Sequence, residues 1–277
     1  MRFCFITTTV GTITRIVPTV AFFVGIALVA TPIMAAPNIT LVPSIPSDTT
    51  TLRDLQQIVL KAPEQLLFDI VWGGWSFNWV HAGQATLDLL PTSNPKVWQI
   101  RSQAWCSGFF QTFYPVQDTV SSYINVQGVY PLKFQKILNE GSYHTRLVAN
   151  YDQQNHILKT QDTSLSIDPF THDILSAFYY IRTQSLTVGK SFELAAVSGK
   201  KKYRLQVLCL REETVEVPAG TFPCVVVEPI LKDDGIFKAR GKLWIWLTRD
   251  PRHLPVRMQS KIPVGSIKAE LVGIGTR

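Results

Sequence analysis

The chain has 277 residues, with 27 basic and 20 acidic side chains, and its formal net charge at pH 7 is +7. The basic residues are scattered, and the one short basic run, Lys200 to Lys202, lies where a tight turn is expected. This modest and dispersed charge excludes an extended basic patch, so we expect no nucleic-acid partner.

The N-terminal segment, residues 1–36, has the order of a secretory signal. Two arginines precede or flank a largely apolar stretch over residues 16–36, which ends in the small residues Ala35 and Ala36. Met34 and Pro37 fit a cleavage site poorly, and about 20 apolar residues can span a bilayer, so an uncleaved membrane anchor is the alternative. In both cases we expect the rest of the chain to lie in the periplasm of a Gram-negative cell envelope. If the signal is uncleaved, the chain is anchored to the inner membrane.

The remainder is expected to form a linker and one domain. Residues 37–50 are rich in Pro, Ser and Thr and show no period, which predicts a linker. Residues 51–277 suit a single β-rich domain, because such domains can reach about 250 residues. Thr51 to Asp54 resembles a capping box and predicts a short N-terminal helix that ends before Pro63.

Beyond residue 63 apolar side chains recur at every second position, which is the period of β-strands. Phe68, Ile70 and Trp72 share one face of the first strand, for example. Clusters of Pro, Asn, Asp, Ser and Gly separate the apolar runs and predict turns. The predicted strands cover residues 68–72, 85–89, 97–105, 133–138, 145–151, 156–161, 191–197, 203–217, 222–231, 239–248, 253–260 and 266–272.

One stretch, residues 173–182, predicts a buried helix instead. Thr171 or Asp173 can cap its start, and apolar or aromatic side chains cover most of its circumference. Such a helix needs partners on more than one side. The predicted fold is therefore mainly β: an antiparallel curved sheet or incomplete β-barrel wrapped round one buried helix, about 173–183, plus the short N-terminal helix.

The strand at residues 241–248 supports this architecture. Leu243, Ile245 and Leu247 face one way, while Trp244 and Trp246 face the other. A sheet with water on one side alternates apolar with polar residues. We therefore expect this strand to be covered, or to line a cavity, on its second face.

Three cysteines follow the N-terminal segment, and Cys209 and Cys224 lie on strands joined by a turn. If Pro218 and Ala219 form the centre of that turn, Cys209 lies opposite Glu228 and Cys224 lies opposite Glu213, so four residues of offset separate the two cysteines. This offset corresponds to about 13 Å, whereas bridged Cα atoms are under about 7 Å apart. We predict no disulfide between them.

The order of these landmarks resembles the exported bacterial proteins of the DUF3108 family, a domain of unknown function. The resemblance rests on the runs at residues 68–72, 82–87, 114–124, 173–182, 216–222, 243–250 and 254–256. It implies a β-rich envelope domain similar in shape to the half-barrel lipoprotein carriers of the periplasm. It implies no catalytic residues. The Trp-rich stretch from Trp75 to Trp79 departs from the family's pattern.

Searches for catalytic and metal-binding motifs give none. The sequence contains no His-Glu-x-x-His and no Gly-x-Ser-x-Gly, and its five histidines lack metal-ligand spacing. We therefore expect no enzyme, no metal and no cofactor. An enzyme would require Asp118, Asp173 and Arg182 to converge in one pocket; the alternative is that they serve turns, caps and ion pairs.

The remaining functional signal is aromatic. Large aromatic side chains along a curved sheet can line an apolar site, and a basic residue can orient a polar head group. The candidate ligand-binding residues are Trp72, Trp75, Phe77, Trp79, Phe178, Arg182, Trp244 and Trp246.

Two functions fit these residues. The first is an envelope protein that binds or chaperones a hydrophobic or lipidic molecule. The alternative is a protein-interaction module in envelope assembly with a fully packed interior. Membrane contact is expected only through the N-terminal segment or the aromatic loop around Trp75 to Trp79.

Overall fold

The computed structural model describes residue 46 and residues 52–55, 59–74, 77–108, 111–112, 114–231, 242–261 and 265–275. The predicted signal or anchor and nearly all of the predicted linker lie outside these residues. The side chain of Phe77 is likewise not described.

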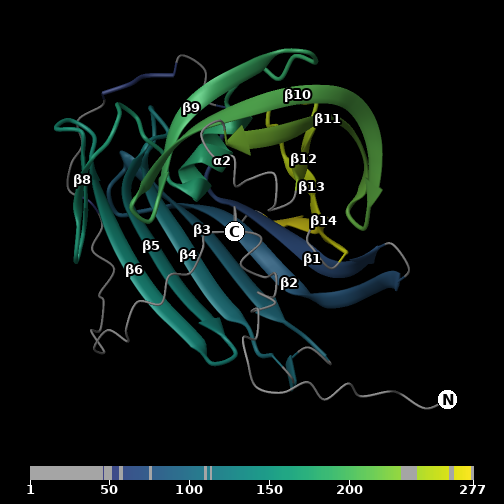
Figure 1. Ribbon diagram of the computed structural model, residues 1–277. Helices are drawn as coiled ribbons and strands as arrows, with labels where there is room; N and C mark the ends of the chain where they lie inside the picture. The colour runs from purple at the N-terminus through teal and green to yellow at the C-terminus, as the bar shows by residue number, and fades with distance from the viewer. Residues whose placement is uncertain are drawn as a thin grey trace.

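One antiparallel sheet dominates the described chain (Figure 1). Its strands lie in the order β8-β7-β6-β5-β4-β3-β2-β1-β14-β13-β12-β11-β10-β9, so almost every strand pairs with its neighbour in sequence. The predicted mainly β fold with an open antiparallel sheet is confirmed. The strands are β1 (Glu64–Gly74), β2 (Phe77–Pro91), β3 (Val97–Cys106), β4 (Gln117–Asn125), β5 (Pro131–Glu140), β6 (Tyr143–Asp152), β7 (Ile157–Thr160), β8 (Ser164–Ser166), β9 (Ser191–Ser198), β10 (Lys201–Val217), β11 (Gly220–Leu231), β12 (Leu243–Thr248), β13 (Pro255–Lys261) and β14 (Ser266–Gly275).

The sheet does not close, and β8 and β9 are its edges. The chain leaves β8 and reaches the helix through His172, whose backbone bonds to the other edge. His172 N–H donates to the carbonyl of Ala195 over 2.8 Å, and Val197 N–H donates to the carbonyl of His172 over 2.9 Å. The residues before the helix therefore run between the two edges and protect part of β9 from pairing with another chain.

The predicted buried helix is α2 (Ile174–Arg182). Asp173 caps it, because its Oδ1 accepts hydrogen bonds from the N–H groups of Leu175 and Ser176. Its apolar side chains join the main core of the sheet. Among the described residues no helix is long and apolar enough to span a bilayer.

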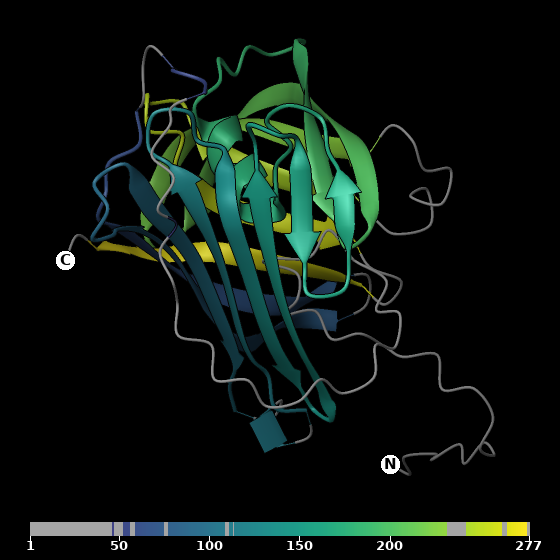
Figure 2. The same cartoon turned by 90° about the vertical axis from the view of Figure 1, so that its left-hand side faces the viewer.

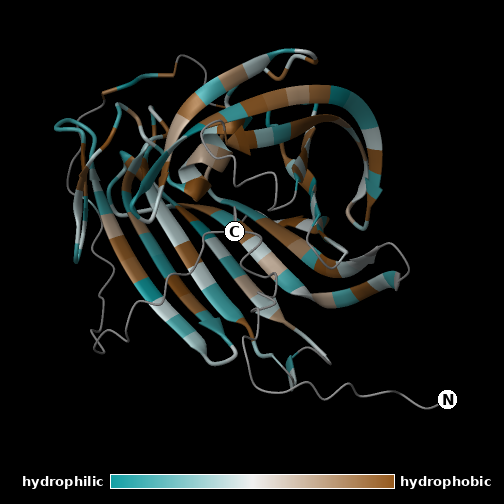
Figure 3. Cartoon of the chain, in the orientation of Figure 1, coloured by the Kyte–Doolittle hydropathy of each residue, from teal (hydrophilic) through white to brown (hydrophobic). Residues whose placement is uncertain are grey.

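Ser122 identifies the face of the sheet that meets the helix. Its Oγ lies 2.6 Å from Oδ2 of Asp173. Directly paired residues of neighbouring strands share a face, so Leu89, Ile100 and Phe134 lie on the same side as Ser122. We call this side the helix-side face and the other the outer face. Apolar and polar residues alternate along these strands (Figure 3).

Strand β12 is buried on both faces, as its sequence predicts. Ile245 and Leu247 are buried on the helix-side face, and Trp246 is buried on the outer face. The long hairpin of β10 and β11 curls over that outer face (Figure 1). Arg257, paired with Trp246, donates to the carbonyl of Glu216 over 2.7 Å, close to the hairpin tip. The second apolar face is therefore covered by the chain's own hairpin.

The cysteines of this hairpin are free and buried, in agreement with the predicted absence of a bridge. Cys224 lies opposite Glu213, as the turn predicts, but Cys209 lies opposite Val227 and not Glu228. A bulge between Cys209 and Arg211 inserts one extra residue and shifts the register by one.

The prediction of a short N-terminal helix is wrong for the residues that the structure describes. Residues 52–55 and 59–62 are not helical. Leu52 N–H instead donates to the hydroxyl of Tyr130, and Leu55 N–H donates to the carbonyl of Gln127. These bonds to distant parts of the chain satisfy donors that a helix would leave free at its first turn. The strand prediction also missed β4 and β8.

Arg53 fastens this segment to the sheet and helix. Its guanidinium donates twice to the carbonyl of Gly128, at 2.9 and 2.7 Å. It also lies over the rings of Phe170 and Tyr180, at 4.5 and 4.4 Å from their centroids. Partly buried cation–π contacts and charged hydrogen bonds of this kind stabilise a fold.

We expect Arg53→Ala to lower the free energy of unfolding by about 1–2 kcal/mol, because both kinds of contact are lost. Urea denaturation measures the change. Arg53→Lys is the matched variant: it keeps the charge over the rings but loses the two-pronged bond, so an intermediate loss is expected. Equal stability of the wild type and Arg53→Ala would contradict a stabilising role for these contacts of Arg53.

Candidate functional site

The predicted site residues do not gather at one place. Phe178 and Arg182 lie on α2, and Trp72 lies on the helix-side face of β1. Trp79 is 40% exposed near the start of β2, in a strand and not in the predicted loop. Trp244 and Trp246 lie on β12.

The side chains of two candidate residues lie outside the described structure. Trp75 lies outside the described residues, and Phe77 begins β2 but its side chain is not described.

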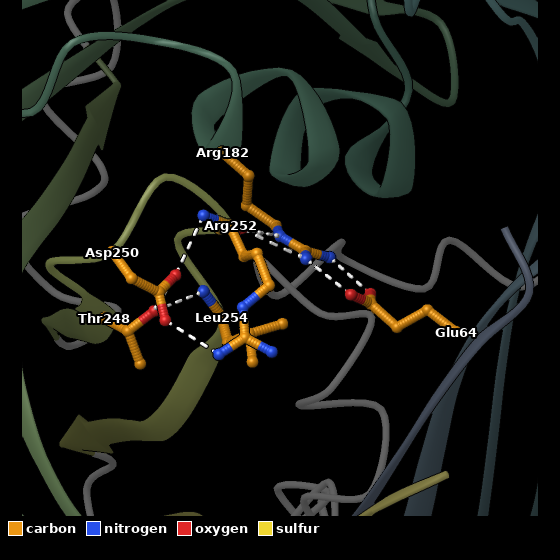
Figure 4. Close-up of polar contacts among 6 residues, drawn as sticks. All are labelled: Glu64, Arg182, Thr248, Asp250, Arg252 and Leu254. Carbon is orange, nitrogen blue, oxygen red and sulfur yellow. Dashed lines mark hydrogen bonds and ion pairs between the residues drawn. The ribbon is translucent and has the colours of Figure 1, made fainter. Parts of the chain in front are cut away.

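Arg182 is buried, with 1% of its surface exposed, and forms a two-pronged ion pair with Glu64 (Figure 4). Its Nη1 and Nη2 lie 2.7 and 2.9 Å from the two carboxylate oxygens. Burial by itself lowers the pKa of Arg182, but the Glu64 carboxylate more than offsets this and the pKa is raised. Tyr179 lies beneath the guanidinium, at 4.8 Å.

The turn between β12 and β13 is fixed onto the same helix end (Figure 4). The carbonyl of Arg252 accepts from the Arg182 guanidinium, at 3.3 and 3.4 Å. Asp250 in turn accepts from the backbone and side chain of Arg252, each at 2.8 Å. The guanidinium is therefore committed to protein partners, and the head-group role expected of Arg182 does not fit this geometry.

Removing Glu64 should strongly destabilise the protein. Glu64→Ala leaves a buried guanidinium without its counter-charge, and we expect the free energy of unfolding to fall by about 3–5 kcal/mol. The double variant Glu64→Leu with Arg182→Met removes both charges and should cost less than the single change. Urea denaturation of the three proteins checks the order. A Glu64→Ala protein as stable as the wild type would contradict the importance of this ion pair.

A second buried charge lies at the other end of the helix. Burial raises the pKa of Asp173 to about 6, although the hydrogen bonds from Ser122, Ser176 and Leu175 favour its charged form. His172 is also buried, with Nδ1 at 3.2 Å from the Ser176 hydroxyl and Nε2 at 3.4 Å from Arg53. Burial, with the nearby Arg53 charge, holds the pKa of His172 well below its usual value.

Asp173 makes stability fall as pH rises. Its carboxyl keeps a proton in the folded state up to about pH 6, whereas in the unfolded chain it loses the proton near pH 3.9. The unfolded state is therefore favoured progressively between these values, by about 3 kcal/mol in total.

Asp173→Asn keeps the cap but cannot ionise, so we expect the stability of the variant relative to the wild type to rise between pH 4 and pH 6. Urea denaturation at several pH values, with His172 unchanged in both proteins, measures that difference. A difference that does not vary with pH would contradict the raised pKa.

Asp118, Asp173 and Arg182 do not converge. Asp118 Oδ1 accepts from the N–H of Asn139 on the neighbouring strand. Asp118 lies four residues from Ser122 along β4, about 13 Å, and Ser122 is the residue that touches Asp173. Arg182 lies nine residues beyond Asp173, about 14 Å of helix. The pocket that the enzyme hypothesis requires is not formed by these residues.

The helix-side face carries a polar cluster that the sequence reasoning missed. Its members, Ser102, Asp118, Lys136 and Glu140, share one face by the register of β3, β4 and β5. Ser102, Asp118 and Glu140 are each less than 5% exposed. The alternation Phe134, Lys136, Leu138, Glu140 in β5 is the signal that could have revealed it, because it places charges on an apolar face.

Ser102 Oγ has no hydrogen-bond partner in the described structure, whereas the Asp118 carboxyl lies within hydrogen-bond reach of the Glu140 side chain. Burial raises the pKa of Asp118 and lowers the pKa of Lys136. Buried polar atoms are nearly always hydrogen-bonded, to protein, water or ligand. The cluster therefore offers a hydroxyl and an ammonium group to water or to a polar ligand group.

A hydrogen-bonded chain on the outer face has the residue types of a hydrolase. Ser107 Oγ lies 3.1 Å from Nδ1 of His81, and Nε2 of His81 lies 3.3 Å from Asp69 Oδ1, which also accepts from Gln84. However, His81 and Asp69 are open to solvent, and Ser107 N–H already donates to the carbonyl of Ala82. That N–H is not free to stabilise an oxyanion beside the hydroxyl.

Among the described side chains, no group of three or more His, Cys, Asp or Glu is placed to hold a metal ion.

Comparison with known proteins gives a family and a fold. Residues 68–272 match the model of the family described as "Protein of unknown function (DUF3108)", so the resemblance seen in the sequence is confirmed. Among curated proteins, none matches this sequence.

The fold is shared with a solved β-barrel-like protein of the domain of unknown function DUF1849 from Brucella abortus. The TM-score is 0.56 at 10% identity, over 78% of this chain and 98% of that one. A DUF1089 family protein from Pseudomonas aeruginosa matches with a TM-score of 0.39 at 12% identity, over 69% and 94% of the two chains. The TM-score of 0.39 is too low to establish a shared fold. At 10% identity, the likeness to the DUF1849 protein concerns the fold alone.

Proposed function

Because the chain belongs to the DUF3108 family, whose function is unknown, we propose its function from the geometry of its sheet. The proposal is a non-enzymatic, exported protein of the cell envelope that binds or chaperones a hydrophobic or lipidic ligand. The ligand lies on the helix-side face, and the open sheet acts as an incomplete barrel around α2 and the ligand.

The observation that carries this proposal is the mismatch in length between the helix and the strands. Helix α2 has nine residues and is about 14 Å long. Strand β2 has 15 residues and is about 50 Å long. Figures 1 and 2 show the long strands running well beyond the helix. Among the described residues, α2 is the only helix that packs on this face. Beyond it Ala104 and Leu138 are buried, whereas Trp72 and Leu147 stay partly exposed and offer apolar surface to another occupant.

Burial of apolar surface would supply the affinity. Each methylene group of an acyl chain contributes about 0.8 kcal/mol when it leaves water. Apolar residues such as Trp72, Ala104, Leu138 and Leu147 lie on the helix-side face at or beyond the level of the helix. They would line the ligand's apolar part.

The polar cluster replaces Arg182 as the group that orients a head group. Lys136 and the unpartnered Ser102 Oγ lie at the level of Val120, two residues from Ser122, and Asp118 lies four residues from Ser122. A ligand with an apolar tail and a hydrogen-bonding head suits this arrangement, because a buried polar group without a partner destabilises the unliganded protein.

The periplasmic location and membrane contact through the N-terminal segment remain part of the proposal. They rest on the apolar segment at residues 16–36, which lies outside the described structure.

A protein-interaction module is the second candidate. The exposed indole of Trp79, on the outer face, favours it. In that case the helix-side face is filled by the chain itself, and an envelope protein is the partner.

Two measurements test the carrier proposal. Native mass spectrometry of protein purified from envelopes without detergent should show bound lipid, and a fluorescent fatty-acid analogue should bind and be displaced. Absence of both bound lipid and displacement would overturn the proposal in favour of the interaction module.

A matched pair of variants on β6 locates the ligand. Leu147 pairs with Lys136 and faces the helix side, whereas Val148 lies next to it on the outer face, and both are partly buried. We expect Leu147→Gln to weaken binding of the fatty-acid analogue about tenfold, which corresponds to the loss of one or two buried methylene groups. Val148→Gln should leave binding unchanged. Equal effects in a fluorescence titration would place the ligand elsewhere.

A further inference from the structure

A row of aromatic and basic side chains crosses the outer face near one end of the sheet. We call it the aromatic–lysine strip, and its members come from β2, β12, β13, β14 and the residue before β12. They are Trp79, Trp244, Lys242, Lys261 and Lys268.

The register of the strands places these residues on one side. Lys268 pairs with Gln259, which pairs with Trp244, so Lys268 and Trp244 share a face. Lys261 lies two residues from Gln259, and Lys242 lies two residues from Trp244, so both point the same way. The contact between Trp79 and Lys268 brings β2 into the same row.

Two lysines lie over two indole rings. Lys268 Nζ is 3.6 Å from the ring centroid of Trp79, and Lys261 Nζ is 5.7 Å from that of Trp244. Trp79 is 40% exposed, and Lys261 and Lys242 are exposed as well. Each stacked pair presents an indole and an ammonium group together, and the pairing restricts their motion before any partner arrives.

The acidic residues nearby offset only part of this charge. Glu228 forms an ion pair with Lys242 over 3.9 Å, Glu270 forms an ion pair with Arg257, and Asp69 accepts a hydrogen bond from the neutral amide of Gln84. The three lysines and Arg257 outnumber these three carboxylates by one, so the strip keeps a net positive charge, with Lys261 exposed.

We propose that the aromatic–lysine strip docks the domain onto the surface of an anionic phospholipid bilayer. Indole rings favour the interface between head groups and acyl chains, because one part of the ring is apolar and the N–H is polar. Lysine ammonium groups pair with lipid phosphates while their stems lie along apolar surface. The apolar N-terminal segment would hold the domain close to such a surface. This inference does not depend on a ligand in the sheet.

The test uses the full chain and vesicles of phosphatidylcholine with increasing phosphatidylglycerol. The N-terminal segment contributes to binding in every variant, so the readout is the gain in affinity caused by phosphatidylglycerol. Neutralising the strip with Lys242→Gln, Lys261→Gln and Lys268→Gln should reduce that gain about fivefold per lysine, the effect of one basic residue near an anionic surface. The matched control is Lys200→Gln, Lys201→Gln and Lys202→Gln, at the exposed turn between β9 and β10.

Tryptophan fluorescence gives a second readout. Brominated phosphatidylglycerol should quench the emission of the wild type, and Trp79→Phe should remove a larger part of the quenching than Trp98→Phe, whose ring packs against the core. Equal loss of the phosphatidylglycerol-dependent gain in the strip and control variants would overturn the proposal, and so would equal quenching in the two Trp variants. Fatty-acid binding by the strip variants, measured in parallel, separates this outcome from failure of the carrier proposal.

Discussion

The fold depends on how one short helix is held against a large open sheet. Each end of α2 carries a buried charged side chain whose partner belongs to another element. Asp173 bonds to Ser122 on β4, and Arg182 pairs with Glu64 at the start of β1. Nine helical residues are too few to be stable in isolation. The helix therefore exists because these contacts and its apolar packing fix it, and the two charges also fix its direction and position on the sheet.

This arrangement gives the two faces of the sheet different characters. Beyond the helix, the helix-side face carries apolar side chains and a buried polar cluster that includes an unpartnered Ser102 hydroxyl. The outer face is closed by the chain's own hairpin near Trp246, yet it presents Trp79 and two stacked lysines at one end. An apolar face with few polar groups suits a ligand, and a face with indoles and ammonium groups suits a charged interface. The two proposals therefore concern separate surfaces and can fail independently.

Prediction succeeded where the signal was local. Alternating apolar residues predicted most strands, and Asp173 before an apolar run predicted the helix and its cap. It failed where the partner is distant in sequence. Thr51 to Asp54 has the composition of a helix start, but bonds to Gln127 and Tyr130 hold the described part of this segment in another conformation. Arg182 is separated from Glu64 by 118 residues, so the sequence could not reveal that its guanidinium is already bound.

The sequence by itself determined the class of fold, because side-chain alternation with a period of two can bury one face of a chain only in a sheet. It also determined the turn between Val217 and Gly220 and hence the separation of Cys209 from Cys224. Only the tertiary structure decided which face each aromatic residue occupies and which charges are paired. A single bulge between Cys209 and Arg211 shifts the register by one residue, and such shifts depend on packing between strands that are far apart in the chain.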